Sequence, residues 1–448
     1  MNKKLMAVAV AGALSAPVLA VAQVGSSPGV TLYGRLDETI VNSKYSANGA
    51  GTISSVTKSD VWSPGNAIGV RGREDLGGGT AVWFQLEAGA WPDGRLDSTA
   101  TTGSHFGGRN SGLGVSSGLG DIMWGGWDQP YKVAYGTWNS VTSGGFSAAG
   151  IIMGNGDTTG ALTNPACTTA VSNTAGSVTL GVGNVCVTEA TSNGTAWSRR
   201  TNNSIQYWSP VFSGVQFRLG TALANYQAPD TAFPNGTPKP QVLSGNVTFA
   251  RGPLSVGGAY ENHKGLRPGT GVGQNPNPTD SAIQIGGKWN FGIAEVGAGY
   301  EQLKYDDNGV AGAAAGNNGG MKVPSWVVNG RVNAGPGAVW ASYSKSQGGK
   351  DCSLASGNMV IGGAACGVSA KMTTVGYDYI MSKRTKLYVA YNKIDNGFNG
   401  TVGTNYYYIA GPAGQNGGLA PNTNAGTASG IAQGTDVTTV GLGLQHTF

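Results

Sequence analysis

Residues Val30-Thr-Leu-Tyr-Gly-Arg-Leu-Asp37 alternate between two kinds of side chain. An extended strand points successive side chains to opposite faces. The aliphatic residues of this stretch therefore share one face, and Tyr33, Arg35 and Asp37 share the other. Alternation of this kind indicates a strand with one apolar face and one polar face.

The same two-residue period returns along the whole chain and predicts sixteen strands. Very short turns such as Leu76-Gly-Gly-Gly79 join them in pairs, and long segments rich in Gly, Asn, Thr and Ala separate the pairs. The expected strands cover residues 29–41, 66–74, 80–90, 108–117, 121–131, 203–210, 215–225, 241–250, 254–263, 281–290, 293–304, 325–333, 338–346, 372–381, 385–393 and 436–448.

This layout predicts an all-β fold, a 16-stranded antiparallel transmembrane β-barrel with short periplasmic turns and long extracellular loops. A membrane offers no hydrogen-bond partners to an open sheet edge, so the sheet has to close on itself. Sixteen strands enclose an interior too wide for side chains to fill, and water is expected to occupy it.

The composition agrees with an exported strand protein. Charged residues make up 11% of the chain, against about 25% in ordinary globular proteins, and 77 of the 448 residues are glycine. After the first residues no apolar run reaches the length of a membrane-spanning helix. The formal net charge of +5 is too small to indicate a nucleic-acid partner.

The N-terminal residues resemble an export signal. Lys3 and Lys4 precede a short apolar run, and small residues follow at Ala20-Val-Ala22. We expect residues 1–22 to be a cleaved signal peptide and residues 23–448 to form the barrel domain. The alternative is a membrane-anchoring helix, but the apolar run is short and no stop-transfer charges follow it.

Four cysteines lie in the exported part, where an oxidising compartment favours disulfides. Four cysteines allow three pairings, and we favour Cys167–Cys186 and Cys352–Cys366 because each pair lies within one polar segment. Metal ligation is the alternative, but no C-x-x-C spacing occurs. No metal site and no cofactor are predicted.

The parity of each strand predicts which charged residues face the lumen, if the aliphatic face meets lipid. The lumen-facing basic residues would be Arg35, Arg71, Arg73, Arg218, Lys288 and Arg331, and the acidic ones Asp37, Glu87, Glu295, Glu301 and Asp378. A basic patch from neighbouring early strands would favour anions. The alternative is that these arginines pair with Asp37 and Glu87 and only tie the wall together; parity leaves the direction of Arg109 open.

Several stretches together resemble the general porins of β-proteobacteria, over nearly the whole exported chain. The matching stretches are Val30–Asp37, Gly72-Arg-Glu-Asp-Leu-Gly-Gly-Gly79, Asn203-Ser-Ile-Gln-Tyr207 with Ser209-Pro-Val211, Ser382-Lys-Arg-Thr-Lys-Leu-Tyr388 and Val440-Gly-Leu-Gly-Leu-Gln-His-Thr-Phe448. This resemblance implies a homotrimer of 16-stranded channels in the outer membrane, surrounded by lipid and lipopolysaccharide.

The resemblance also implies roles for two parts of the chain. Residues 132–202, called the third loop below, would fold into the barrel and form its constriction, with Trp127 and Asp128 at its entrance. Phe448 would be the lipid-facing aromatic that the barrel assembly machinery reads. The chain departs from the family at Trp124-Gly-Gly-Trp-Asp-Gln-Pro130 and at Asn66-Ala67, where arginines are common, which puts inherited selectivity in doubt.

The aromatic residues near the start of the third loop allow two interpretations. A solute-specific channel could use Trp124, Trp127, Tyr131, Tyr135 and Trp138 as a stacking path. Aromatic residues more often belong to the girdle at the membrane interface or pack a loop against the wall.

Catalysis is not indicated. The three histidines, His105, His263 and His446, accompany none of the G-x-S-x-G, H-E-x-x-H or P-loop motifs. We therefore expect a general diffusion porin that leans toward anions rather than an enzyme. The alternatives are a channel that prefers one organic acid or sugar, and an adhesive or structural surface protein.

Overall fold

The computed structural model describes residues 29–46, 55–90, 92, 107–141, 143, 145–149, 152–154, 197–198, 200–223, 241–265, 277, 279–305, 321–347, 369–396 and 436–448. Strands dominate these residues, with one short α-helix, α2 (Pro130–Val133), and one 3-10 helix, η1 (Ala134–Thr137). The described strands are β1 (Gly29–Tyr45), β2 (Val56–Trp62), β3 (Ala67–Gly77), β4 (Thr80–Ala88), β5 (Ser111–Ser117), β6 (Gly120–Asp128), β7 (Arg200–Trp208), β8 (Val215–Leu223), β9 (Gln241–Arg251), β10 (Leu254–Lys264), β11 (Thr279–Asn290), β12 (Ala294–Tyr305), β13 (Met321–Ala334), β14 (Gly337–Ser346), β15 (Ala370–Ile380), β16 (Thr385–Asn396) and β17 (Val437–Thr447).

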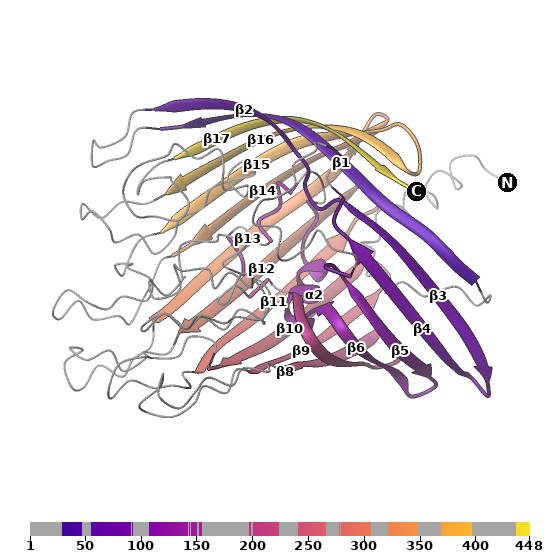
Figure 1. Ribbon diagram of the computed structural model, residues 1–448. Coiled ribbons are helices and arrows are strands. Elements are labelled where there is room, and N and C mark those ends of the chain that lie inside the picture. Colours follow the sequence, from indigo (N-terminus) through magenta and orange to yellow (C-terminus); the bar gives the residue numbers. More distant parts are fainter. Residues whose placement is uncertain are drawn as a thin grey trace, which may run out of the picture.

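These strands form one closed antiparallel barrel (Figure 1). From β3 to β17 each strand pairs with the next along the chain, and β17 pairs back onto β1 from Arg35↔Thr447 to Tyr45↔Val437. Pairing of β17 with β1 closes the sheet, as a membrane without hydrogen-bond partners requires. The expected all-β closed barrel of sixteen positions is confirmed.

Seventeen described strands fill sixteen barrel positions because β2 and β3 share one. β2 pairs with the Thr39–Tyr45 half of β1, and β3 pairs with the Gly29–Arg35 half. Between them Pro64 cannot donate a ladder hydrogen bond, and Gly65 has a φ of 70°. The sequence pattern predicts a strand over residues 66–74, which corresponds to β3, and it does not predict β2.

The expected strand over residues 121–131 is wrong at its C-terminal end. β6 stops at Asp128, and α2 begins at Pro130. Proline is tolerated in the first turn of a helix, where its missing N–H is not needed, whereas it cannot continue a paired strand. The third loop therefore leaves the sheet earlier than the alternation suggested.

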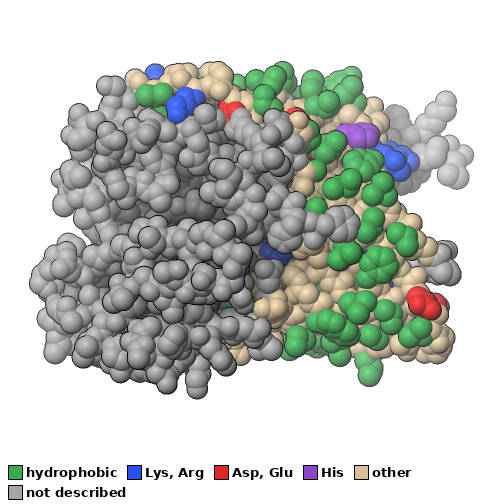
Figure 2. All heavy atoms as spheres, viewed as in Figure 1, with side chains coloured by type: hydrophobic (Ala, Val, Ile, Leu, Met, Phe, Trp, Pro, Cys, Tyr) green, Lys and Arg blue, Asp and Glu red, His purple; other side chains and the backbone are tan. Residues whose placement is uncertain are grey.

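The outer surface is apolar. Every second side chain along the strands is exposed, for example Leu32 at 61%, Ile40 at 63% and Ile285 at 65%. Figure 2 shows such side chains gathered in a band over the strands. The tight turns lie at the same end of the barrel as the C-terminus (Figure 1).

The last residue completes the barrel seam. The N–H of Phe448 donates to the carbonyl oxygen of Gly34 and the N–H of Gly34 donates to that of Phe448, both at 3.1 Å. The Phe448 ring fills the space that a Cβ on Gly34 would need. Leu442, Leu444 and His446 are exposed on the same outer face as Phe448.

Candidate functional site

The third loop begins inside the barrel, where α2 and η1 pack against β8 to β11 (Figure 1). The side chain of Trp138, which directly follows η1, is fully buried. The indole lies over Gly286 and Gly299, and the backbone carbonyl of Trp138 lies over Gly297. A Cβ on Gly299 would stand 2.9 Å from the ring atom Cδ2. Three inward-facing glycines thus make a flat platform on the wall, and we call the inner face of β10 to β12 the docking wall.

A carboxylate on the docking wall holds both sides of the loop. Glu301 accepts hydrogen bonds from the hydroxyls of Tyr131 at 2.8 Å and Tyr135 at 3.0 Å, and from the N–H of Gly154 at 2.7 Å. Burial, and the nearby Glu301 carboxylate, hold the pKa of Tyr131 well above its ordinary value. The Tyr131 hydroxyl therefore keeps the proton that it donates. Glu301 was predicted to face the lumen, but loop residues cover it completely.

Further contacts fasten the loop to the same wall. Trp197 stacks on His263 with ring centroids 3.8 Å apart, and His263 lies 2.7 Å from Glu261. Lys288 donates to the carbonyl oxygen of Asn139 at 3.2 Å and lies 3.4 Å from Glu295. Lys288 and Glu295, both predicted to line the lumen, thus lie on the inner face but mainly anchor the loop.

A second anchor ties the loop to the next strands of the barrel, β13 to β16. The hydroxyl of Ser143 donates to Asp378 Oδ1 at 2.6 Å and accepts from Lys386 Nζ at 2.6 Å. Asp378 also accepts from Arg331 at 2.8 Å and from the Trp340 indole at 2.9 Å. Asp378 is fully buried, whereas the Arg331 side chain is 22% exposed.

Arg35 of β1 lies near this anchor, on the face of its strand that parity predicts to face the lumen. Arg35 pairs with Asp37 at 2.6 Å, and the Asp37 side chain is fully buried while that of Arg35 is 34% exposed. Lys386 lies within electrostatic reach of Arg35, Asp37 and Arg331. We call the inner surface formed by Arg35, Arg71, Arg73, Arg331 and Lys386 the basic wall.

Arg71 and Arg73 make no ion pair within the described residues. The Arg71 guanidinium lies 4.9 Å from the centre of the Tyr33 ring. Arg73 Nη1 donates to the hydroxyl of Ser116 at 3.4 Å. Their positive charges are therefore not matched by carboxylates on the described part of the wall.

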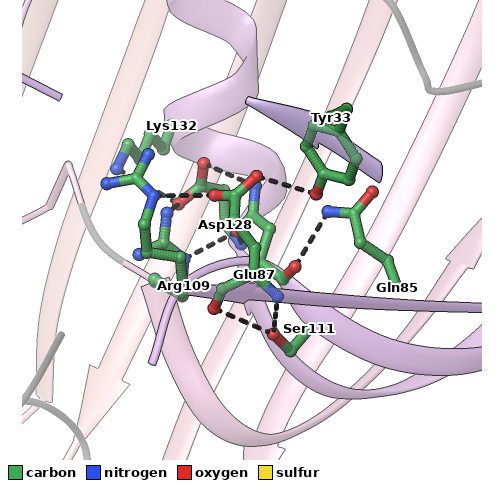
Figure 3. A network of polar contacts seen from close by, with 9 residues as sticks. Tyr33, Gln85, Glu87, Arg109, Ser111, Asp128 and Lys132 are labelled. Carbon is green, nitrogen blue, oxygen red and sulfur yellow. Dashed lines mark hydrogen bonds and ion pairs between the residues drawn. The ribbon is translucent and has the colours of Figure 1, made fainter. Parts of the chain in front are cut away.

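Glu87 has a different partner from the one that the structural alternative named. Arg109 donates to its Oε1 at 2.7 Å and Tyr33 donates to its Oε2 at 3.0 Å (Figure 3). Parity leaves the direction of Arg109 open because this residue shares parity with the aliphatic Leu113 and Val115. In the structure Arg109 precedes β5 and its guanidinium points inward, so Arg109 rather than an early-strand arginine pairs with Glu87.

Asp128 forms the next part of the same network (Figure 3). It lies 3.1 Å from Lys132 Nζ and 3.2 Å from Arg200 Nη2, and it accepts from Asn110 Nδ2 at 3.1 Å. Lys132 comes one turn later in α2, and Arg200 opens β7 at the far end of the third loop. The two ends of the loop are thus tied together by one carboxylate and two cations.

Trp127 belongs to a packed cluster of tryptophans. Its ring centroid lies 5.7 Å from that of Trp83 and 5.4 Å from that of Trp208, and the Arg218 guanidinium lies over Trp208 at 5.2 Å. Trp83 and Trp208 are only 5% and 4% exposed. These rings contact one another rather than forming an open stacking path.

The other aromatic residues belong to the girdle or pack the loop against the wall, and none of them lies on an open stacking path in the described part of the chain. Trp124 is 45% exposed on the outer face, whereas Tyr131, Tyr135 and Trp138 pack the loop against the wall. The four cysteines Cys167, Cys186, Cys352 and Cys366, together with His105 and residues 1–22, lie outside the described residues. The two disulfides and the signal peptide remain predictions, as does the role of Phe448 in insertion.

Sequence reasoning missed four functional side chains: Arg109, Lys132, Arg200 and Lys386. Lys386 could have been found, because it shares the inward parity of Tyr388 on β16. The other three lie before β5, in α2 and at the first residue of β7, where a two-residue period gives no direction. Asn66, which stands where an arginine was expected, accepts from the N–H of Asp37 at 2.6 Å.

No helix among the described residues is both long and apolar enough to span a membrane. No group of three or more His, Cys, Asp or Glu side chains placed to hold a metal ion occurs in the described ranges.

Comparison with known proteins gives consistent relatives. A family model described as Gram-negative porin matches residues 6–400. Outer membrane porin protein 32 of Delftia acidovorans is 28% identical over 461 aligned positions, covering 100% of both chains. Major outer membrane protein P.IB of Neisseria gonorrhoeae is 33% identical over 135 residues, which is 30% of this chain and 37% of that protein.

Solved structures share the fold. The anion-selective porin from Comamonas acidovorans aligns with a TM-score of 0.62 and 22% identity, covering 94% of this chain and 100% of that one. The trimer form of OmpT from Vibrio cholerae aligns with a TM-score of 0.56 and 14% identity, with the same coverage.

Fold and family together point to a non-enzymatic channel. The closed barrel with an apolar outer face lies in the outer membrane and forms a water-filled path for ions and small hydrophilic solutes. The chain belongs to the Gram-negative porin family.

Proposed function

We propose that this porin is a general diffusion channel that prefers anions. The observation that carries the proposal is that, in two ion pairs of the barrel wall, the arginine side chain is exposed and its carboxylate partner is buried. The Arg35 side chain is 34% exposed over a buried Asp37, and that of Arg331 is 22% exposed over a buried Asp378. Solutes in the lumen therefore meet guanidinium groups, while the carboxylates lie behind them.

The number of cations for each carboxylate adds to this bias. Asp378 has two cationic neighbours, Arg331 and Lys386, and Asp128 also has two, Lys132 and Arg200. Arg71 and Arg73 add charge that no described carboxylate balances. A wall lined by one sign of charge raises the local concentration of the opposite ions.

The competing interpretation is that the arginines only tie the wall together. The ion pair of Arg109 with Glu87 does connect the start of β5 to β4, whereas Arg35 and Asp37 lie on one strand. Lys288 with Glu295 departs from the exposure pattern, since both are nearly buried. That last pair lies under the third loop. A structural role and an anion preference are compatible, because a paired arginine still presents its free edge to water.

Reversal potentials in a KCl gradient across planar bilayers test the proposal. We expect a potential that reports preferential passage of chloride, decreasing as the salt concentration rises because exposed charges are screened. A clear preference for K⁺ would rule the proposal out. Conductance that saturates with one added sugar or organic acid would instead favour the substrate-preferring alternative.

We also propose that the chain works as a homotrimer, with β1 and the β2–β3 break at the subunit interface. Glu38 lies on the outer parity of β1 between Leu36 and Ile40, and Ser63 and Asn66 donate to it at 2.7 Å. A charged side chain that faces lipid near mid-membrane destabilises a barrel, although a carboxylate costs less than a lysine or arginine. A neighbouring subunit over this face would remove that contact with lipid.

Native mass spectrometry of the detergent-extracted protein tests the assembly. We expect a trimer mass for the wild type and a larger monomer fraction for Ile40→Arg, which places a second charge on the same face. Leu442→Arg, on the neighbouring strand, tells whether the interface extends to β17. A wild type that is monomeric under these conditions would contradict the proposal.

A further inference from the structure

One part of the third loop, residues 145–149, packs against the break between β2 and β3, and we call it the loop tip. Phe146 is fully buried, and its ring meets that of Trp62 edge-on, with ring centroids 6.0 Å apart. Gly145 has a φ of 65° and lies against the same indole. A Cβ on Gly145 would collide with the Trp62 ring and stand 3.3 Å from Pro64 Cβ. The loop tip therefore rests on the last residue of β2 and on the proline that follows it.

A single carboxylate of β1 holds both sides of this break. The hydroxyl of Ser63 donates to Glu38 Oε1 at 2.7 Å, and the Asn66 side-chain amide donates to the same oxygen at 2.7 Å. Ser63 and Asn66 flank Pro64 and Gly65, and both are only 2% exposed. Glu38 thus fixes where the chain leaves β2 and where it enters β3.

The network passes through the wall from the outer face to the inner face. Asp37 and Glu38 are consecutive in β1, so their side chains point to opposite faces. Asn66 joins the two, because its Oδ1 also accepts from the N–H of Asp37 at 2.6 Å. On the inner side, the Phe146 ring covers Gly441 of β17, where a Cβ would stand 2.8 Å from the ring atom Cζ. The loop tip therefore lies behind the part of the wall whose outer face carries Glu38.

We propose that the break couples subunit assembly to the position of the loop tip. The inference rests on the homotrimer proposed above, and its partner is a second copy of this chain packed over Glu38. A subunit there removes the carboxylate from lipid and fixes its hydrogen bonds to Ser63 and Asn66. Fixed ends hold Pro64 and the adjacent Trp62 in place, and the loop tip rests on both. The constriction is therefore set in the trimer and looser in the monomer.

Such a coupling has to act in both directions. A partner shifts a conformational equilibrium only as far as it favours one of the two states, and the free energy of coupling between two binding events is reciprocal. A change under the loop tip must then weaken assembly, although it touches no neighbouring subunit. A change at Glu38 on the outer face must in turn unsettle the loop tip inside the barrel.

The first test changes the inside and measures assembly. Gly145→Ala pushes the loop tip away from Trp62, and it should shift the monomer–trimer equilibrium at least about fivefold toward monomer. Native mass spectrometry over a series of protein concentrations measures this equilibrium. Gly257→Ala is the matched control, because it crowds Thr137 of η1 against β10 instead. The control should leave the equilibrium unchanged.

The second test changes the outside and measures the channel. Glu38→Ala leaves Ser63 and Asn66 without their shared acceptor, so visits to other current levels in planar bilayers should become more frequent by the factor found in the first test. Glu38→Gln keeps an acceptor oxygen and should behave more like the wild type. Val247→Ala shortens an exposed side chain on the outer face of β9 and should leave the current steady.

The outcomes separate this inference from the homotrimer on which it rests. A stable trimer whose equilibrium is unchanged by Gly145→Ala, or whose current is as steady in Glu38→Ala as in the wild type, would overturn the coupling and leave the homotrimer standing. Equal effects in the Gly257 control would also overturn it. A wild type that stays monomeric at every concentration would overturn both proposals. Circular dichroism shows that the variants keep their strands.

Discussion

The docking wall and the basic wall line neighbouring parts of the same barrel, and their carboxylates have different surroundings. On the docking wall, Glu301 accepts three hydrogen bonds from the third loop, two of them from neutral tyrosine hydroxyls. On the basic wall, Asp37 and Asp378 are buried behind arginine side chains that remain partly exposed. Both sets follow the same two-residue period.

This difference shows that an inward direction does not by itself make a residue part of the pore. Glycines beside Glu301 leave room for Trp138, so the loop settles there and removes the wall from contact with water. Asp378 lies beside Trp340 and two cations, and Ser143 is the residue of the described part of the loop that donates to it. The space left by neighbouring side chains decides which inward residues a solute can meet.

The largest expected effect comes from Trp138→Ala. The substitution empties the space over Gly286 and Gly299, and removing a buried tryptophan costs about 3–5 kcal/mol. We expect a lower thermal unfolding temperature and a higher, noisier single-channel conductance, because the loop no longer stays on the docking wall. Trp124→Ala, which removes an outer-face indole, is the matched control and should leave the mean conductance unchanged.

Gly299→Val tests the same contact by changing the wall residue instead of Trp138. A side chain on Gly299 would collide with the Trp138 ring, so the variant should raise conductance much as Trp138→Ala does. Gly330→Val, on the outer parity of β13, gives a comparison in which the loop is not touched. Normal conductance in the Gly299 variant would mean that the loop is held mainly by Glu301 and Ser143.

Arg35→Gln and Arg71→Gln separate the two roles on the basic wall. Both should shift the reversal potential in a KCl gradient toward K⁺, because each removes a positive charge from the lumen. Arg35→Gln should also lower the free energy of unfolding by about 1–3 kcal/mol, since Asp37 is left buried without its cation. Arg71→Gln leaves no described carboxylate unpaired and should change stability little. Two variants with equal stability loss and no change in potential would favour a purely structural role.

The smallest expected effect is a dependence on alkaline pH. The pKa of Tyr131 is raised in the folded protein, so its contribution to loop docking is complete below the ordinary tyrosine pKa of about 10. Above that pH the unfolded or undocked state releases the proton more readily, and docking weakens as pH rises. Conductance measured between pH 9 and pH 11 should therefore increase, and Tyr131→Phe should flatten the curve. A flat wild-type curve would contradict this.

Much of the barrel was predictable because one face of each strand has to be apolar. Residues such as Leu32 and Ile40 alternate with Arg35 and Asp37, and the structure keeps this division along β1. The prediction was wrong where the two-residue period stops. The sequence pattern does not predict β2 over residues 56–62. It predicts that Gln129 to Tyr131 continue a strand, although Pro130 begins a helix.

The amino-acid sequence alone determined that the chain closes into a barrel with an apolar outside and a polar inside. The reason is local: successive side chains along a strand point to opposite faces, so the alternation of apolar and polar residues assigns the two faces of each strand. Only the tertiary structure decided that Arg109 rather than an early-strand arginine pairs with Glu87, that Glu301 is covered, and that the loop tip meets Trp62 at the β2–β3 break. These outcomes depend on strand register and on where the third loop packs, and both are set by contacts between residues far apart in the chain.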